Sequence, residues 1–383
     1  MPDRTTRSVS KGESMIPVNE PVLGKSEKAL LAECIDSGWI SSEGPFVARF
    51  EEEMAGQVGR RYGIAVCNGS AALDVSVVAL GIGRGDEVIM PAFTIISCAA
   101  SVIRAGATPV LVDCDPITWN MDVRQIESKI TARTRAIMAV HIYGLPVDMD
   151  PVMALAERYG LLIIEDSAEM IGQTYKGRPC SSFGDISALS FYPNKHVTTG
   201  EGGMVLTDDA NLYAKCRRYR NLCFQKENRF VHEELGWNYR MTNMQAAVGI
   251  AQLERIDETV AAKRRMGNRY TELLAGLETL ELPVARIGYA DNIYWVYGLV
   301  LADTVAFSAK EIMQRLGCKG IGTRPFFWPM HKQPVFQKMG LFKDDVHPVA
   351  ERLATRGFYL PSGIGLREQQ MEQVAQTLSE VLR

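Results

Sequence analysis

Hydrophobic and polar positions follow two alternating patterns along most of this chain. Short apolar runs rich in Val, Ile and Leu are separated by longer segments in which apolar residues recur every three or four positions. The runs predict strands at 64–67, 87–90, 108–113, 134–140, 161–166, 186–189 and 204–207. The segments predict helices at 22–38, 46–58, 71–80, 95–105, 123–129, 151–159 and 210–219. This alternation is typical of an α/β fold with a mostly parallel sheet flanked by helices on both faces.

The pattern changes in the last part of the chain. Residues from about 243 to 274 predict one long helix, rich in Ala, Leu and paired charges, which is typical of a connector between domains. Beyond it the pattern predicts a small α+β unit with a strand at 294–301, a helix at 308–316, a strand-like stretch at 320–324 and a closing helix at 368–382. We therefore expect a large domain over 15–255 and a small C-terminal domain over 256–383. Residues 1–14 are polar, so we expect a disordered N-terminus and no signal peptide.

Charge and composition narrow the range of partners. The formal net charge is -3 and lysine and arginine form no basic block, so nucleic acid is not an expected partner. No apolar run approaches the roughly 20 residues that a membrane span needs. The cysteines are scattered without a C-x-x-C pair, which is typical of reduced thiols and indicates neither a disulfide framework nor a metal site. We expect a cytoplasmic protein.

One stretch between two predicted strands carries chemistry that the fold itself does not require. Residues 190–203 read Ser-Phe-Tyr-Pro-Asn-Lys-His-Val-Thr-Thr-Gly-Glu-Gly-Gly and contain a single lysine, Lys195. Burial between apolar strands would disfavour the ammonium form of this lysine and lower its pKa. A neutral lysine amine can attack a carbonyl and hold it as a Schiff base. The alternative is a surface turn that contains a lysine by chance.

Other polar residues lie where ligands of parallel sheets bind, at the carboxyl ends of strands. The residues at or just after predicted strand ends are Asn68, Phe93, His141, Asp166 and Lys195. At Asn68 a strand turns through Gly69 into a helix whose free N–H groups suit a phosphate, although a plain strand–helix turn is the alternative. Asp166 would keep a ring nitrogen protonated, or cap a helix. A phosphate site, a carboxylate and a lysine together favour pyridoxal 5'-phosphate as the cofactor, with no metal.

From about Ile16 to its C-terminus the chain resembles the fold-type I aminotransferases of the DegT/DnrJ/EryC/StrS family. The motifs that carry the resemblance are Asn-Gly-Ser-Ala-Ala-Leu at 68–73, Ile-Glu-Asp-Ser-Ala-Glu at 164–169, the lysine stretch at 190–203 and Gly-Trp-Asn-Tyr-Arg-Met at 236–241. The resemblance implies a transaminase that uses pyridoxal 5'-phosphate, with a large cofactor-binding domain and a small C-terminal domain. It also implies a homodimer with shared active sites.

The resemblance assigns a role to each matching residue around the cofactor ring. Lys195 matches the lysine that binds the cofactor through an imine, and Asp166 matches the aspartate that pairs with the pyridine nitrogen. Phe93 is at the position expected to stack on the ring. Glu169 lies near the ring hydroxyl, where many relatives have Gln.

The phosphate contacts are implied in the same way. The amides of Gly69 and Ser70 and the hydroxyl of Ser190 are expected to hold the phosphate of the subunit's own cofactor. Asn238 is expected to reach the phosphate of the neighbouring subunit's cofactor. This last contact is what implies the shared active sites.

Three further stretches, at 39–42, 198–204 and 324–331, resemble members of the family that move the glutamate amino group onto C4 of GDP-4-keto-6-deoxymannose. Such members serve the synthesis of surface glycans such as the O-antigen of lipopolysaccharide. A related dehydratase has His in place of the lysine, so Lys195 favours transamination. Tyr192-Pro193 and the segment 223–230 depart from these members. A UDP- or dTDP-linked ketosugar is therefore an alternative substrate, and a regulator that binds the cofactor without catalysis is an alternative function.

The expected mechanism gives Lys195 a second role as general base, which needs a pKa near neutrality. The candidate substrate contacts in the predicted small domain are Arg324, Phe326 and His331, because a basic group suits a carboxylate or a diphosphate. For His331 and His141 a purely structural role is the alternative. The aromatic residues Trp295, Tyr297 and Trp328 are predicted to belong to the core.

Overall fold

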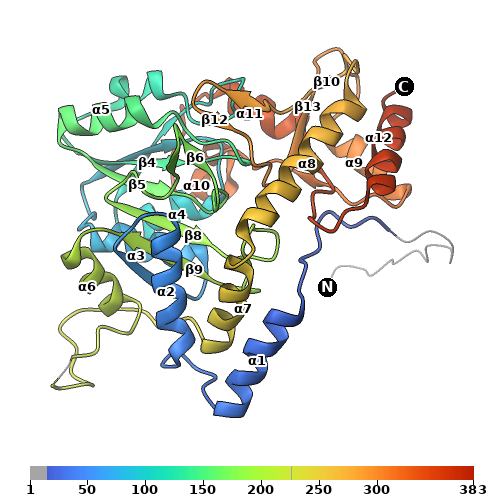
Figure 1. The fold of residues 1–383 in the computed structure, drawn as a ribbon. Coiled ribbons are helices and arrows are strands. Elements are labelled where there is room, and N and C mark those ends of the chain that lie inside the picture. Colours follow the sequence, from blue (N-terminus) through green and yellow to red (C-terminus); the bar gives the residue numbers. More distant parts are fainter. Residues whose placement is uncertain (1–14, 226) are drawn as a thin grey trace.

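The computed structural model describes residues 15–225 and 227–383 (Figure 1), so the prediction for residues 1–14 lies outside the described residues. A seven-stranded sheet with the order β1-β9-β8-β5-β4-β2-β3 forms the centre of the larger part. Its strands are β1 (Tyr62–Val66), β2 (Glu87–Pro91), β3 (Thr108–Val112), β4 (Thr134–Val140), β5 (Leu162–Asp166), β8 (Ile186–Ser190) and β9 (Gly203–Thr207). Only β9 runs against the other strands of this sheet. The predicted mainly parallel sheet is thus confirmed.

Helices cover both faces of this sheet, as the alternating pattern predicted. One face packs against α3 (Gly69–Ala79), α4 (Ile96–Arg104) and α6 (Ala210–Tyr219). The opposite face packs against α2 (Pro45–Gln57) and α7 (Asn243–Leu253) at one side and against α5 (Met149–Tyr159) at the other. Helix α1 (Lys25–Ser37) lies on α7. Because neighbouring strand residues point to opposite faces, Glu165 and Asp166 of β5 face different layers.

The C-terminal part has a sheet of its own. Four antiparallel strands follow the order β10-β13-β15-β14. They are β10 (Leu280–Glu281), β13 (Tyr297–Leu301), β14 (Arg324–Pro325) and β15 (Gly357–Leu360), with α9 (Ala309–Cys318), α11 (Pro348–Arg356) and α12 (Glu368–Leu382) around them. Figure 1 shows α8 (Ile256–Leu274) running from the end of α7 toward this second sheet, alongside α12. The remaining short elements are β6 (Thr174–Tyr175), β7 (Arg178–Pro179), β11 (Arg286–Ile287), β12 (Ala290–Asp291), η3 (Met330–Lys332) and α10 (Pro334–Lys338).

Two predicted helices are wrong in detail. The single helix over 243–274 is broken between α7 and α8, where Arg255 leaves the helical region (φ -117°, ψ 24°) and its guanidinium reaches Glu27 of α1. The helix over 123–129 is instead two 3₁₀ turns, η1 (Val123–Gln125) and η2 (Glu127–Lys129). Seven residues are too few to sustain an α-helix without strong packing. The predicted strand over 320–324 is reduced to β14.

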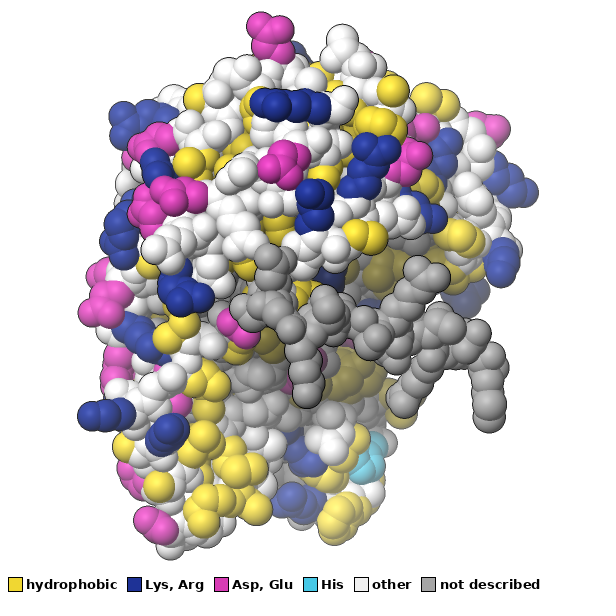
Figure 2. Space-filling model, turned by 90° about the vertical axis from the view of Figure 1, so that its right-hand side faces the viewer, with side chains coloured by type: hydrophobic (Ala, Val, Ile, Leu, Met, Phe, Trp, Pro, Cys, Tyr) yellow, Lys and Arg dark blue, Asp and Glu magenta, His cyan; other side chains and the backbone are white. Residues whose placement is uncertain are grey.

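The outer surface shows no segregation of charge on the face drawn in Figure 2, where Lys and Arg alternate with Asp and Glu. This mixture agrees with the small net charge of -3. Among the described residues, none of the helices combines the length and the apolar character that crossing a membrane requires.

Candidate active site

A cavity of about 380 Å³ opens at the carboxyl edge of the large sheet, where β1, β2, β4, β5 and β8 end. Six of the predicted cofactor residues line it, namely Gly69, Ser70, Asp166, Glu169, Ser190 and Lys195. They come from segments far apart in the sequence. The topology brings them together because the carboxyl ends of parallel strands share one edge.

One end of the cavity is built from hydroxyls and the start of α3. Asn68 caps this helix, since its Oδ1 accepts a hydrogen bond from the Ala71 N–H at 2.8 Å. The hydroxyls of Ser70 and Ser97 are 2.7 Å apart at the starts of α3 and α4. A Cβ on Gly69 would lie 2.9 Å from the Cβ of Ser190, so the backbone approaches this serine as only glycine permits. Two helix N-termini and three serine hydroxyls form a site suited to a phosphate.

At the far side of the cavity lies Asp166, a buried carboxylate. Its Oδ1 accepts a hydrogen bond from the Ala168 N–H at 3.1 Å, and its Oδ2 accepts one from the Cys98 thiol at 3.1 Å. No helix begins here, so Asp166 is not a helix cap. Because the thiol is a weak hydrogen-bond donor, this carboxylate can accept a further hydrogen bond from a donor in the cavity. A protonated ring nitrogen is such a donor.

Lys195 and Glu169 meet between these two ends. The Lys195 Nζ lies 3.6 Å from the Glu169 Oε1, while the Glu169 Oε2 accepts a hydrogen bond from the Tyr143 N–H at 2.7 Å. Burial lowers the pKa of Lys195, although the carboxylates of Glu169 and Asp166 oppose this. Burial likewise raises the pKa of Glu169 to about 7, against the opposing effect of Lys195. The cavity therefore offers a lysine whose neutral amine is favoured by its surroundings.

Phe93 does not lie on the cavity wall. Its side chain is fully buried and packs 6.0 Å from the ring of Tyr143 and 5.8 Å from that of Phe327, measured between centroids. Thr94 and Ile95 line the cavity in its place. Phe93 follows β2 by two residues, and its side chain packs among the aromatic rings behind the wall. Stacking of Phe93 on the cofactor ring stays a prediction.

The three predicted substrate residues have different surroundings. Phe326 is buried between Tyr143 and Trp119, at centroid distances of 4.7 and 5.3 Å, so it belongs to the core. His331 is buried and its Nε2 lies 2.9 Å from the Glu351 Oε1, a contact that suits the structural alternative, so its contact with substrate stays a prediction. Arg324 is exposed on β14. It pairs in register with Tyr359, whose side chain lies on the cavity wall.

Asn238 lies outside this cavity. Its backbone forms a bridge with Asn221, next to a separate small pocket that includes Arg217, Arg220 and Arg240. A contact of Asn238 with a neighbouring subunit's cofactor thus stays a prediction.

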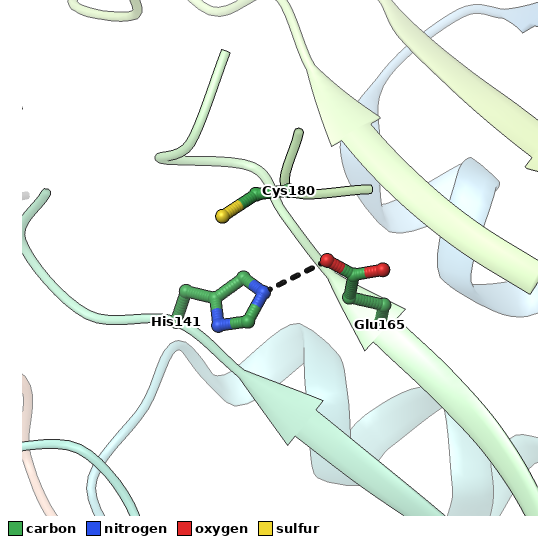
Figure 3. A group of neighbouring side chains, drawn as sticks. All are labelled: His141, Glu165 and Cys180. Carbon is green, nitrogen blue, oxygen red and sulfur yellow. Dashed lines mark hydrogen bonds and ion pairs between the residues drawn. The ribbon is translucent and has the colours of Figure 1, made fainter. Parts of the chain in front are cut away.

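Figure 3 shows a second buried polar group, formed by His141, Glu165 and Cys180. Of these residues, His141 also lines the cavity. The Glu165 carboxylate already accepts hydrogen bonds from the His141 Nε2 at 3.0 Å and from backbone N–H groups of the turn 181–184. The His141 Nδ1 accepts one from the Val147 N–H at 3.0 Å. Burial alone would raise the pKa of Glu165, but hydrogen bonds from His141 and these N–H groups lower it to about 2. His141 and Glu165 thus have hydrogen-bond partners in each other and in the neighbouring backbone, which makes the pair a structural junction between strand ends.

Several wall residues escaped the sequence reasoning. Ser97 and Ile95 could have been found, because they lie at the start of a predicted helix that follows a predicted strand, as Ser70 does. Trp295 was assigned to the core, and it is buried, yet its ring also forms part of the wall over Lys195. Phe327 and Tyr359 come from the C-terminal part, and no local pattern in the sequence points to them.

The residues present fit pyridoxal 5'-phosphate at every reactive position. Helix N-termini and hydroxyls suit its phosphate, Asp166 suits its ring nitrogen, and the amine of Lys195 suits its aldehyde. Fold and site together define a fold-type I aminotransferase that depends on this cofactor. The sequence profile of the DegT/DnrJ/EryC1/StrS aminotransferase family matches residues 21–379, and the chain belongs to that family.

Known relatives extend this assignment over nearly the whole chain. A GDP-perosamine synthase of Caulobacter vibrioides is 43% identical over 96% of this chain and 98% of its own length. A UDP-N-acetyl-3-dehydro-alpha-D-glucosamine 3-aminotransferase of Acidithiobacillus ferrooxidans is 39% identical over 87% of each chain. The solved structure of an aminotransferase from Psychrobacter cryohalolentis superimposes with a TM-score of 0.89 at 32% identity, covering 94% of this chain and 98% of that one.

Proposed function

We propose that this aminotransferase moves the amino group of L-glutamate onto C4 of GDP-4-keto-6-deoxymannose, which yields GDP-perosamine for a surface polysaccharide such as O-antigen. The observation that carries the chemistry is the placement of Lys195 within contact of Glu169 in a cavity that also holds Asp166 and a phosphate-binding corner. Similarity over nearly full length to a GDP-perosamine synthase supports the choice of substrate.

In this mechanism Lys195 moves protons at defined atoms. The bound cofactor supplies an electron sink for the carbanion that forms next to the transferred nitrogen. Lys195 Nζ, as a neutral amine, would remove the proton from Cα of glutamate in the first half-reaction. The amino nitrogen would stay with the cofactor, and water would supply the keto oxygen of the 2-oxoglutarate that leaves. In the second half-reaction Lys195 Nζ delivers a proton to C4 of the sugar. Asp166 holds the ring nitrogen in its protonated form, and Ser70, Ser97 and Ser190 hold the phosphate in place.

The C-terminal part contributes a cover to the site. Trp295, Phe327 and Tyr359 place aromatic rings on the cavity wall and reduce the access of water to Lys195. We also propose that Arg324, which is exposed and pairs in register with Tyr359 of the cavity wall, binds an anionic group of the substrate. We propose that residues 15–255 and 256–383 form the two domains, with the boundary at the break before α8.

Exposed apolar residues support a homodimer with shared sites. Phe230, Val231 and Leu235 lie on one loop with 79%, 61% and 91% of their surface exposed, and Trp39 and Ile40 are half exposed at the end of α1. Exposed apolar surface is unfavourable in an isolated subunit and is typical of a subunit interface. The arginine pocket beside Asn238 would then face the partner's cavity and offer charge to a nucleotide diphosphate. The free cysteines fit a reducing compartment, so we place the reaction in the cytoplasm.

An aminotransferase acting on a UDP-linked ketosugar is the second candidate. The observation that favours it is the 39% identity to the UDP-sugar aminotransferase of Acidithiobacillus ferrooxidans. The pocket for the nucleotide separates the two candidates, and the chemistry at Lys195 is the same in both.

The test is amination with glutamate that carries a heavy nitrogen isotope, followed by mass spectrometry of the nucleotide sugar. GDP-4-keto-6-deoxymannose should acquire the label faster than UDP- or dTDP-linked ketosugars, and Lys195→Ala should abolish the transfer. A preference for a UDP- or dTDP-linked ketosugar would overturn the substrate and leave the transaminase. A loaded protein whose cofactor absorbance does not respond to glutamate would instead indicate a binding protein without catalysis.

A further inference from the structure

The side chain of Trp295 lies against the catalytic lysine in two ways. Its ring centroid is 3.7 Å from the Lys195 Nζ, which places the ammonium group over the face of the indole. Its indole N–H donates a hydrogen bond of 2.8 Å to the carbonyl of Asn194, the residue before Lys195. One side chain therefore contacts both the reactive group and the backbone from which that group extends.

Trp295 is itself fixed from behind by a buried lysine on α8. The Lys263 Nζ donates hydrogen bonds to the Trp295 carbonyl at 2.9 Å and to the Ser362 carbonyl. The Lys263 side chain is almost fully buried. The indole thus approaches Lys195 from the C-terminal part of the chain on a support that joins α8, the start of β13 and the segment after β15.

We infer that Trp295 is a positioning residue for the proton-carrying lysine: its indole face holds the Lys195 ammonium group, and its N–H holds the loop that carries Lys195. This inference rests on the role given to Lys195 in the proposed function. The proposed function names the residues that bind the cofactor, and this inference adds a residue that influences whether Lys195 is charged.

The chemical reason lies in the two states of Lys195 Nζ. In each half-reaction this atom alternates between amine and ammonium, and a buried ammonium group is costly without a compensating contact. An aromatic face supplies such a contact and favours the charged form. Glu169 contacts the same nitrogen at 3.6 Å, so Nζ lies between an acid and a ring. The titratable groups that influence Lys195 or are influenced by it are Glu169, Asp166, Cys98 on α4, Lys263 on α8 and the adjacent His196.

The inference is tested on the cofactor-free protein by competitive labelling of lysines across a pH series with limiting acetic anhydride. Peptide mass spectrometry then gives the pH midpoint at which Lys195 becomes reactive. Trp295→Leu removes the ring face, so the midpoint should move to lower pH by roughly 0.4 to 1.5 pH units. Trp295→Phe keeps a ring face and should recover most of this difference.

Trp119→Leu is the matched control. The rings of Trp295 and Trp119 are both buried and pack 5.8 and 6.4 Å from the ring of Tyr143, measured between centroids, yet Trp119 does not line the cavity. An unchanged midpoint in folded Trp295→Leu, or an equal displacement in Trp119→Leu, would overturn the inference. If Trp295→Leu fails to fold, the wild-type sequence is made with increasingly fluorinated tryptophan. Fluorination weakens the ring face, so the Lys195 midpoint should fall stepwise, and a constant midpoint contradicts the inference.

The labelling needs neither cofactor nor substrate, which separates the two proposals. A wild-type protein that fails to aminate any nucleotide sugar overturns the proposed function and leaves the labelling result standing. An active enzyme whose Lys195 midpoint ignores the indole overturns the inference alone.

Discussion

At the scale of single residues, two buried carboxylates flank Lys195 and differ in how they are held. Asp166 accepts hydrogen bonds from one backbone N–H and one thiol, so it can accept a further hydrogen bond from a group in the cavity. Glu169 has one backbone N–H and Lys195, and its pKa rises to about 7 because burial outweighs both. The same sheet edge therefore provides one acid suited to pair with a ring nitrogen and one that exchanges its proton near neutrality.

Replacing Glu169 by Gln should alter the pH dependence of stability of the cofactor-free protein. The folded pKa of Glu169, about 7, lies above its ordinary value of 4.5, so the wild type loses stability as the pH rises through this interval. Gln cannot ionise. The melting temperature of Glu169→Gln relative to wild type should therefore increase between these two pH values and level off above them. A difference that stays constant with pH would show that Glu169 does not titrate in this range.

Ser97 provides a second prediction at this scale. Its hydroxyl lies beside that of Ser70 at the phosphate corner, and a hydrogen bond to a charged group is worth roughly 1.5–3 kcal/mol. Ser97→Ala should weaken binding of pyridoxal phosphate roughly 10- to 100-fold, measured by titrating the cofactor-free protein. Ser101→Ala is the control, because the Ser101 hydroxyl bonds to the Cys98 carbonyl on the same helix and does not line the cavity. Equal losses in both variants would point to α4 as a whole instead of the phosphate contact.

At the scale of elements, the His141–Glu165 junction fixes the strand ends that carry the site. Glu165 of β5 joins His141, which follows β4, to the turn at 181–184 before β8. Asp166 is the next residue on β5 and faces the cavity. A change at Glu165 should therefore reach the site through the positions of these strand ends.

We expect Glu165→Gln to destabilise the fold by roughly 3–5 kcal/mol. In the wild type, hydrogen-bond donors face both carboxylate oxygens, whereas the amide NH2 group of Gln would point its own hydrogens at some of these donors. Urea unfolding measures this loss, and Glu157→Gln on exposed α5 is the control. The wild-type contribution should be complete above pH 4.5, the ordinary pKa of Glu165, and should decline as the pH falls toward its folded pKa of about 2. A loss of less than 1 kcal/mol in Glu165→Gln, by the standard of surface substitutions, would contradict the junction.

Elements of the large sheet could be predicted because each is a short apolar run with its own turn signals. Residues at or directly after the ends of those runs, such as Asp166 and Ser190, were found for the same reason. Orientation was not predictable: Phe93 follows a strand end as Asn68 does, yet its side chain is fully buried and does not line the cavity. At the break before α8, Arg255 contacts Glu27 of α1, and contacts between residues so far apart in the sequence leave no local pattern.

The C-terminal contributions to the site show the same limit. Trp295 and Tyr359 reach the cavity only through the packing of one sheet on the other part of the chain. A buried aromatic residue that packs in a core and one that covers a reactive group have the same sequence signature. Only the structure separates Trp295 from Trp119.

At the scale of the whole molecule, the proposed dimer makes each active site depend on two chains. Lys195→Ala and Asn238→Asp should each be nearly inactive alone, since one lacks the amine and the other brings a negative charge to the partner's phosphate. Mixed after partial unfolding and reassembly, the two variants should recover about one quarter of wild-type activity, because half of the dimers are mixed and each has one intact site. Sedimentation should give twice 42.4 kDa. No recovery in mixed dimers would place Asn238 outside the partner's site.

The most direct test of the central claim is to locate the covalent attachment of the cofactor. Borohydride reduction of the loaded protein, followed by peptide mass spectrometry, should place the cofactor mass on Lys195. Lys263 is the alternative attachment site that makes the result informative. Burial and, to a smaller extent, the charge of Lys195 lower its pKa to about 7. Attachment at Lys195, removed by glutamate before reduction, is the predicted result. Attachment at Lys263, or none at all, would contradict it.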